Sequence, residues 1–238
     1  GGHYDAGREV LAWIGVESKA EPKLFVGESL PELANENPEF FEQTTAMTNV
    51  EPGKWRTTVP LAFRYFRFTT PVKGVRVDAE FTPATDHGAF SSPSRRLEDI
   101  RERAAYTLRL CMRTFLIDGV KRDRLPWGGD FAVSLLSDCH TFHDPDPIRR
   151  SLTVLDSAGP EGGDVNGIVD YSLWTVICHD YYQTYFADRN FLAKRYDGIR
   201  RRLDSFAARE DTDGFIVKDI NWLFIDWTDP KSTVALQI

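Results

Sequence analysis

The sequence has 238 residues, of which 42% are hydrophobic and 27% are charged, a composition typical of globular proteins that excludes global disorder. This length accommodates one large domain or two of ordinary size. The formal net charge of −7 argues against a nucleic-acid partner, because phosphate binding depends on clustered Lys and Arg. No stretch has the long apolar run needed to cross a membrane, so no membrane partner is expected.

The first third of the sequence predicts β-strands. After residue 74, apolar and polar residues alternate with the period of a strand that buries one face. The apolar positions are Val75, Val77, Ala79 and Phe81. Residues 10–14, 23–26 and 63–68 are rich in β-branched and aromatic side chains, which favour strands. We therefore predict an antiparallel β-sandwich, or a portion of one.

The hydrophobic period changes from two to that of a helix after residue 91. Ser94 is suited to cap a helix N-terminus. The apolar residues that follow at helical spacing are Leu97, Ile100, Ala104, Leu108, Cys111 and Phe115. The change predicts a domain boundary at about Ser91, with a β domain over residues 1–90 and a helical domain over residues 91–238.

Two further helix starts are predicted in the middle of the chain. Asp130 is placed to cap or start a helix that runs to about Phe142. Asp146 precedes Pro147, and an N-cap residue followed by proline at the first helical position predicts another helix. Three cysteines lie in apolar helical surroundings, which favours buried free thiols over a disulfide framework.

The next two predicted helices differ in how their apolar residues are distributed. A helix over roughly residues 169–186 carries apolar side chains on nearly every face, so we expect other helices to enclose it. A helix over residues 191–206 has a one-sided apolar stripe, Asp188 as its N-cap, and residues 200–202 facing solvent. Alternation of enclosed and one-sided helices is expected for a barrel with an inner and an outer ring, and equally for a helical bundle.

Residues 118–130 combine three carboxylates, three cationic side chains and an indole with glycines and a proline. Gly and Pro indicate a shaped loop, and loops on a rigid scaffold are common positions for catalytic and binding groups. A solvated charged turn is the alternative. Trp127 next to Gly128 and Gly129 favours a sugar site, because a flat apolar ring suits a sugar face. Carboxylates beside aromatic residues are the groups that glycoside hydrolysis requires.

This segment resembles the active-site signature of bacterial α-L-rhamnosidases, glycoside hydrolase family 78, in the variant Asp-Gly-x-Lys-Arg-Asp-Arg. Weaker similarities occur in other parts of the chain, at residues 64–67, 79–81, 169–174, 179–182 and 225–227. The resemblance implies an α+β multidomain protein, in which an antiparallel β-sandwich portion precedes part of an (α/α)6 barrel. It also implies hydrolysis that releases terminal α-L-rhamnose with inversion, and hence a carbohydrate substrate ending in rhamnose.

The resemblance assigns roles to individual residues. Asp123 falls at the position of the general acid, where many members have Glu, so its carboxyl lies one methylene closer to the backbone. Asp118 and Asp130 fall where rhamnose hydroxyls are bound, with Arg122 as a neighbouring cation and Trp127 as an aromatic wall. The residues expected to complete the wall are Asp170, Tyr171, Trp174 and Trp227.

Two expectations follow for the chemistry. An acid must hold its proton, so we expect Arg122 to pair with Asp118 or Asp130 and not with Asp123. The family's general base is a Glu that follows the Asp-Trp loop of residues 226–227, and no residue of this sequence matches it. We therefore expect the base beyond Ile238 and expect this portion alone to be inactive.

Other functions are weighed against this interpretation. The residues His140, His143, Asp144 and Asp146 suggest a metal site, but the last is better explained as a helix start, and neither a metal nor a cofactor is predicted. A non-catalytic carbohydrate-binding or scaffold protein would stack Trp127, Trp174 and Trp227 on the sugar and use the carboxylates only for hydrogen bonds. Three carboxylates exceed what binding needs, which favours an enzyme. Another helical-barrel glycosidase is a further alternative, whereas a polysaccharide lyase is disfavoured because an acidic pocket repels a uronate substrate.

Overall fold

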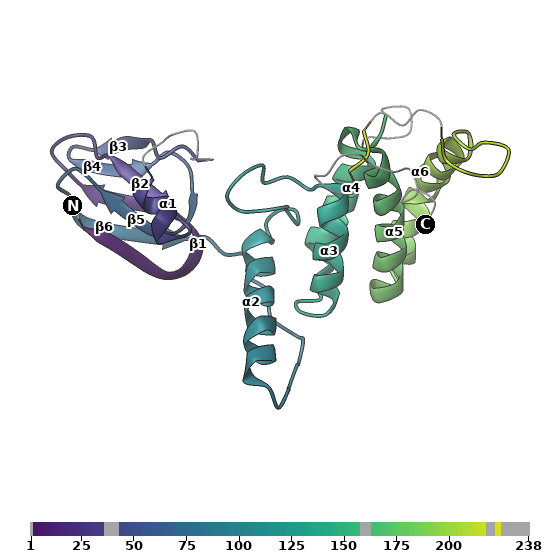
Figure 1. The fold of residues 1–238 in the computed structure, drawn as a ribbon, viewed down its shortest axis with the longest axis horizontal. Coiled ribbons are helices and arrows are strands. Elements are labelled where there is room, and N and C mark those ends of the chain that lie inside the picture. The colour runs from purple at the N-terminus through teal and green to yellow at the C-terminus, as the bar shows by residue number, and fades with distance from the viewer. Residues whose placement is uncertain (1, 36–42, 158–162, 218–221, 225–238) are drawn as a thin grey trace. The chain divides into compact units, whose positions relative to one another are not determined.

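The computed structural model describes residues 2–35, 43–157, 163–217 and 222–224, which form two compact units (Figure 1). The sheet unit comprises Gly1–Pro83, Arg109–Cys111 and Gly119–Arg124. The helical unit comprises Ala84–Leu108, Met112–Asp118 and Leu125–Ile238. The division into domains at residues 1–90 and 91–238 stays a prediction.

The sheet unit is built from a single antiparallel sheet around a long first strand. Its strands are β1 (His3–Glu17), β2 (Leu24–Gly27), β3 (Met47–Glu51), β4 (Lys54–Thr57), β5 (Leu61–Phe68) and β6 (Lys73–Ala79). Strand β1 pairs with β5 as far as Ala12 and with β4 from Gly15 onward. Both residues also pair with β6, so β6 occupies the opposite edge of β1 from β4 and β5. The predicted α+β class with an antiparallel sheet is confirmed.

Aromatic side chains fill the core of the sheet unit. The buried rings of Phe63, Phe66 and Phe68 lie on β5, and Tyr4 stacks on Phe66 with ring centroids 4.7 Å apart. Ile14 of β1 is completely buried in the same cluster. These contacts explain why β1 and β5, which are the richest in aromatic and β-branched residues, are central strands of the sheet.

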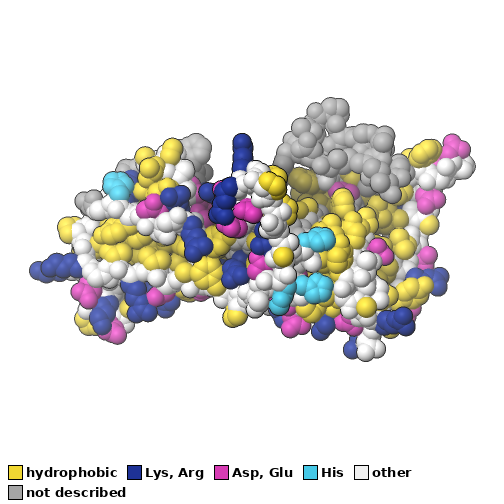
Figure 2. All heavy atoms as spheres, turned by 90° about the horizontal axis from the view of Figure 1, so that it is seen from below, with side chains coloured by type: hydrophobic (Ala, Val, Ile, Leu, Met, Phe, Trp, Pro, Cys, Tyr) yellow, Lys and Arg dark blue, Asp and Glu magenta, His cyan; other side chains and the backbone are white. Residues whose placement is uncertain are grey.

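Strand β6 departs from its predicted burial. The strand ends at Ala79, so Phe81 lies outside it, and Val77 is 37% exposed although alternation predicted a buried apolar face. Figure 2 shows hydrophobic side chains gathered on the face of the sheet unit that is in view. Strands β3 and β4 and the short helix α1 (Leu30–Ala34) were not predicted, because each is only four or five residues long and carries little apolar periodicity.

Among the described residues, five long helices belong to the helical unit, apart from residues 109–111 at the end of α2, and α5 contacts three of the others. These helices are α2 (Arg95–Cys111), α3 (Gly128–Cys139), α4 (Pro145–Asp156), α5 (Val169–Phe186) and α6 (Arg189–Ala207). Helix α5 packs against α3, α4 and α6 (Figure 1). Its buried Cys178 and Tyr182 join Leu135, Ile148 and Leu152 in one hydrophobic core. All three cysteines of the chain are buried with free thiols.

Several helix ends differ from the sequence prediction. Helix α2 begins directly after Ser94 as predicted but ends at Cys111, so Phe115 lies outside it. Helix α3 begins two residues before Asp130, which therefore occupies the first turn. Helix α4 begins at Pro145, and its N-cap is Asp144, whose Oδ1 accepts a hydrogen bond from the Asp146 amide at 3.0 Å. Two consecutive Asp-Pro pairs carry the same start signal, and the earlier one is used.

The bounds of α5 are confirmed, and so is Asp188 as the N-cap of α6, where it accepts a hydrogen bond from the Phe191 amide. Within the described chain α5 is not enclosed on all sides, since Trp174 is 40% exposed. Arg202 was predicted to face solvent but is only 4% exposed. Its Nη1 donates to Ser172 Oγ at 3.3 Å, and burial lowers the pKa of its guanidinium.

The turn between α3 and α4 is held by a buried carboxyl group. Asp138 is completely buried, and its Oδ2 accepts a hydrogen bond from the Asp144 amide at 2.9 Å. Its backbone oxygen accepts from the amides of Thr141 and His143, at 3.0 and 2.8 Å. Burial raises the pKa of the Asp138 carboxyl to about 7. The folded protein therefore binds a proton here that the unfolded chain releases near pH 4.

We predict that Asp138→Asn changes how stability depends on pH. A folded-state pKa above the unfolded value makes the wild-type contribution largest below about pH 4 and smaller as pH rises toward 7. The melting temperature of the variant relative to wild type should thus increase between pH 5 and pH 8, as measured by thermal unfolding. Asp99→Asn is the control and should show no such trend, because the Asp99 side chain on α2 is 47% exposed and forms only a surface ion pair with Arg95. A pH-independent difference for Asp138→Asn contradicts the assignment.

Candidate functional site

The segment of residues 118–130 is divided between the two units. Asp118 and the residues from Leu125 onward belong to the helical unit, whereas Gly119–Arg124 belongs to the sheet unit. The Asp118 amide donates to the Leu125 oxygen at 3.0 Å, and the Leu125 amide donates to Asp118 Oδ1 at 3.0 Å. These two bonds join the ends of the intervening hexapeptide. Asp118 therefore shapes the loop with one oxygen of its carboxylate.

Two glycines allow the N-terminus of α3 to approach α5 closely. A Cβ on Gly128 would lie 2.9 Å from the Tyr171 backbone oxygen, and one on Gly129 would lie 2.6 Å from the Tyr171 ring. The Gly128 amide also donates to Asn166 Oδ1 at 3.0 Å, and Asn166 Nδ2 donates to the Pro126 oxygen at 3.3 Å. The start of α3 is thus fixed both to α5 and to the turn at Asn166 that precedes α5.

Three aromatic rings meet at this junction. The ring of Tyr171 packs edge-on against Trp127, with centroids 6.4 Å apart, and edge-on against Phe224 at 5.8 Å. Trp127 precedes α3 and is half-buried, and its indole Nε1 is buried without a hydrogen-bond partner among the described residues. Phe224 was not predicted as a site residue, although it lies in an aromatic and acidic stretch. The junction provides an apolar wall together with an available N–H donor.

Carboxylates surround the Tyr171 hydroxyl. Tyr171 is 5% exposed, and its hydroxyl donates to Asp130 Oδ2 at 3.3 Å. Burial raises the pKa of Tyr171, and the negative charges of Asp130, Asp170 and Asp118 raise it further. Tyr171 therefore remains a protonated donor at neutral pH. Asp130, which is exposed in the first turn of α3, is favoured there by the partial positive charge of the helix N-terminus.

The other predicted residues of the wall have different positions. Asp170 is buried, and its Oδ1 accepts a hydrogen bond from the Phe224 amide at 2.7 Å, so one oxygen anchors the segment of residues 222–224. Trp174 lies one turn further along α5 and is exposed. Trp227 lies outside the described residues. Asp118, Trp127, Asp130, Asp170 and Tyr171 are therefore assembled in the helical unit.

The remaining predicted residues, Arg122 and Asp123, lie on the segment of the sheet unit. Both side chains are exposed. The Arg124 amide donates to the Arg122 oxygen at 2.6 Å, which closes a tight turn centred on Asp123. Asp123 and Arg124 both have left-handed backbone angles, with φ of 54° and 57°. The pairing of Arg122 with Asp118 or Asp130 stays a prediction.

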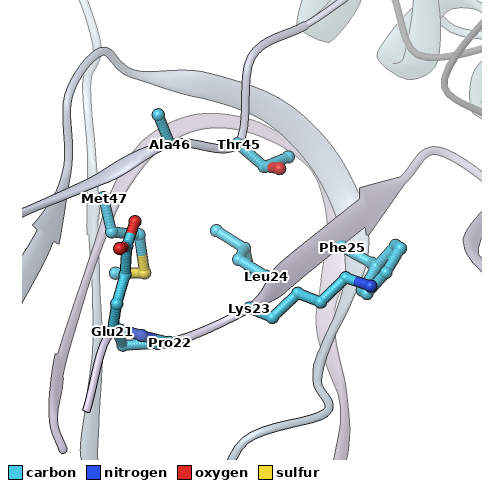
Figure 3. Close-up of a pocket in the computed structure, with 8 residues that line it drawn as sticks. All are labelled: Glu21, Pro22, Lys23, Leu24, Phe25, Thr45, Ala46 and Met47. Atoms are coloured by element: carbon cyan, nitrogen blue, oxygen red, sulfur yellow. The ribbon is translucent and has the colours of Figure 1, made fainter.

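Other potential sites do not contain these residues. A pocket of about 370 Å³ in the sheet unit lies between β2 and residues 45–47, with Leu24 and Met47 among its lining residues (Figure 3). No group of three His, Cys, Asp or Glu side chains in the described ranges is arranged to hold a metal ion. His140 bonds Tyr185 at 3.1 Å, and His143 stacks on Phe186. No helix in the described ranges is long and apolar enough to span a membrane.

We predict that Gly128→Ala destabilises the protein by about 1–3 kcal/mol, because the new methyl group would overlap backbone atoms of α5. Gly198→Ala is the matched control, since a Cβ at that position of α6 meets no atom within 4 Å. The control should gain about 0.5–1 kcal/mol from the higher helix propensity of Ala. Urea unfolding measures both values. Equal effects of the two substitutions would show that the close approach of α3 and α5 is not required.

Comparison with known proteins places these features in a family. The family model described as the bacterial alpha-L-rhamnosidase 6 hairpin glycosidase domain matches residues 85–237. No curated protein matches the chain. Three rhamnosidases are among the solved structures that share its fold. A rhamnosidase from Klebsiella oxytoca with rhamnose bound is 23% identical, with a TM-score of 0.73 over 94% of this chain and 52% of that one.

The other two are more distant in sequence. The family 78 rhamnosidase of Bacillus sp. GL1 is 18% identical, with a TM-score of 0.76 over 94% of this chain and 26% of that one. The α-L-rhamnosidase of Streptomyces avermitilis complexed with L-rhamnose is 17% identical, with a TM-score of 0.59 over 88% and 23% of the two chains. The chain thus spans about half or less of the length of these proteins. Because the family model covers more than half of its residues, the chain belongs to the bacterial α-L-rhamnosidase six-hairpin glycosidase family.

Proposed function

We propose that the protein is a glycoside hydrolase that releases terminal α-L-rhamnose with inversion of the anomeric carbon. The observation that carries this proposal is the cluster of Asp118, Asp130 and Trp127 around Tyr171, in a chain of the rhamnosidase family. The Klebsiella and Streptomyces proteins, which share its fold, are described with rhamnose bound.

Each residue has a chemical role in this proposal. Asp123 protonates the glycosidic oxygen as the bond to the anomeric carbon breaks, and a carboxylate base activates water on the opposite face of the sugar. The base is a Glu outside these 238 residues. Asp118 and Asp130 accept hydrogen bonds from rhamnose hydroxyls, and Arg122 contributes a neighbouring positive charge. Trp127 packs against the apolar face of the sugar, extended by Trp174 and Trp227.

Two residues of α5, Tyr171 and Asp170, hold groups of the proposed sugar-binding surface in place. The Tyr171 hydroxyl donates to one oxygen of Asp130 and so orients the carboxylate, which has acceptor capacity left for a sugar hydroxyl. Asp170 holds the Phe224 amide, and Phe224 packs against Tyr171. A surface whose side chains are fixed before the sugar arrives loses less entropy on binding than a mobile one.

Hydrolysis of a panel of p-nitrophenyl glycosides by the full-length protein tests the function. We expect turnover of the α-L-rhamnoside, with the inverted anomer as first product by NMR. Because a general acid contributes about 10²–10⁴-fold when the leaving group is poor, Asp123→Asn should lower kcat for an alkyl α-L-rhamnoside by about 10²-fold or more, while Asp99→Asn leaves it unchanged. Wild-type kcat in Asp123→Asn would refute the acid assignment. Rhamnose binding without turnover would favour the non-catalytic carbohydrate-binding alternative, and turnover of another glycoside would favour a different glycosidase.

Tyr171→Phe tests the support of Asp130. The substitution keeps the ring that packs against Gly129 and removes only the hydroxyl group. A hydrogen bond of this kind contributes about 1 kcal/mol, so KM for the rhamnoside should rise about 3- to 10-fold with a smaller change in kcat. Tyr196→Phe, at an exposed position on α6, is the control. An unchanged KM in Tyr171→Phe would show that the Asp130 carboxylate needs no support from Tyr171.

A further inference from the structure

The turn that carries Asp123 is flanked by two cationic residues that attach it to the sheet unit. Lys121 precedes the turn, and its Nζ lies 2.6 Å from Glu32 Oε1 and 3.3 Å from Glu28 Oε2. The side chains of Lys121 and Glu32 are each only 20% exposed, so solvent screens this pair less than it screens a surface pair. The first attachment is therefore a partly buried ion pair.

The acceptors of Lys121 are themselves held in place. Glu32 lies on α1, whose N-cap Ser29 accepts a hydrogen bond from the Glu32 amide at 3.3 Å. The Glu28 amide donates to Glu32 Oε2 at 2.9 Å, so the second carboxylate oxygen of Glu32 is also bonded. Gly27 allows this compact arrangement, because a Cβ there would lie 2.8 Å from the Leu33 nitrogen. Lys121 thus binds a carboxylate with a fixed orientation.

Arg124 forms the second attachment on the other side of Asp123. Its Nε donates to the Val120 oxygen at 2.7 Å, and its Nη2 donates to the Pro60 oxygen at 3.1 Å and to Gln43 Oε1 at 3.3 Å. Gln43 in turn bonds Ala62 of β5 in both directions, at 2.8 and 2.6 Å. The guanidinium therefore connects the turn to a central strand through several hydrogen bonds. A lysine, which carries its charge at a single nitrogen, cannot form the same set of bonds.

The segment from Arg122 to Arg124 combines exposed side chains with backbone strain. Arg122 and Asp123 present their side chains to solvent, while Asp123 and Arg124 adopt left-handed φ angles that are unfavourable for residues with a Cβ. Such a conformation costs about 1–3 kcal/mol per residue and persists only where surrounding contacts determine it. The bonds made by Lys121 and Arg124 are contacts of this kind.

A third carboxyl group shows that Lys121 balances an acidic cluster. Burial and the charges of Glu28 and Glu32 together raise the pKa of Glu9 to about 8, and the Lys121 ammonium opposes this rise. Removal of the ammonium group would leave these carboxyl groups without its compensating charge. The segment Gly119–Arg124 would then lose its ion pair with Glu32 of α1.

We propose that Lys121 and Arg124 are positioning residues for the general acid, which they hold by fastening the Asp123 turn to α1 and β5. The sheet unit then has a catalytic task, because it determines where the acid carboxyl is placed. This inference rests on the proposed function, in which Asp123 is the acid.

The dependence on the leaving group tests the inference in the full-length protein. An alkyl α-L-rhamnoside has a poor leaving group that needs protonation, whereas a 2,4-dinitrophenyl α-L-rhamnoside does not. Lys121→Met and Arg124→Met should lower kcat/KM about 10- to 100-fold for the alkyl substrate and less than about threefold for the dinitrophenyl substrate. The inhibition constant of free rhamnose should change less than about threefold, because the sugar-binding residues of the helical unit are untouched and only Arg122 lies in the affected segment.

Matched variants separate positioning from general damage. Arg64→Met removes a bidentate ion pair with Asp5 in the same sheet unit and should affect neither substrate. Glu32→Gln should resemble Lys121→Met, and the double variant should lose no more than either single one, since both act through one contact. If Arg124→Met does not fold, Arg124→Lys replaces it and should show the same selective loss.

The outcomes are distinguishable. Equal losses on both substrates, or no loss in the Lys121 and Arg124 variants, would overturn the positioning role. Asp123→Asn should show the same leaving-group selectivity with a larger effect. If Asp123→Asn lacks that selectivity while the wild-type protein hydrolyses rhamnosides, the acid assignment fails and the positioning role fails with it. If Asp123→Asn shows the leaving-group selectivity and the Lys121 and Arg124 variants do not, only the positioning role fails.

Discussion

The packing of Tyr171 against Gly128 and Gly129 is the contact on which the candidate site depends. The two glycines allow the first turn of α3 to lie against the backbone and ring of Tyr171, where any side chain would overlap them. This approach brings Asp130 within 3.3 Å of the Tyr171 hydroxyl and places the Trp127 ring edge-on to the phenol. Burial of a large aromatic side chain contributes about 1.5–3 kcal/mol, so the same contact stabilises the fold and arranges the site.

The carboxylates around Tyr171 combine structural and binding roles. Asp118 and Asp170 each accept a backbone amide, from Leu125 and from Phe224, and so shape two chain segments that begin far apart in sequence. A carboxylate has about four acceptor positions, so one bond to the backbone orients it without exhausting its capacity. Bonds of this kind fix the carboxylates before a ligand binds, which is the arrangement that precise recognition of a sugar requires.

Between residues 118 and 130 the chain passes from the helical unit to the sheet unit and back. The chain leaves the helical unit after Asp118 and re-enters it at Leu125, and the two hydrogen bonds between these residues close the excursion. The six residues in between carry the proposed acid and take their contacts from α1, Gln43 and Pro60. A short loop with its own anchors can tolerate two left-handed residues that a free loop would relax.

Local sequence signals were enough to predict several elements of the fold and the site. They include strands β1 and β5, the bounds of α5, the Asp188 cap and the family signature at residues 118–130. Burial and the choice of hydrogen-bond partner depend on residues that are distant in sequence, so they became visible only once the chain was folded. Arg202 looks solvated within its helix, yet α6 turns it toward Ser172. Asp144 and Asp146 carry the same cap signal, and Asp170 looks like a ligand-binding group until the Phe224 amide occupies one of its oxygens. Periodicity reports which faces of a helix are apolar, whereas the identity of the group that meets each face depends on how the elements pack.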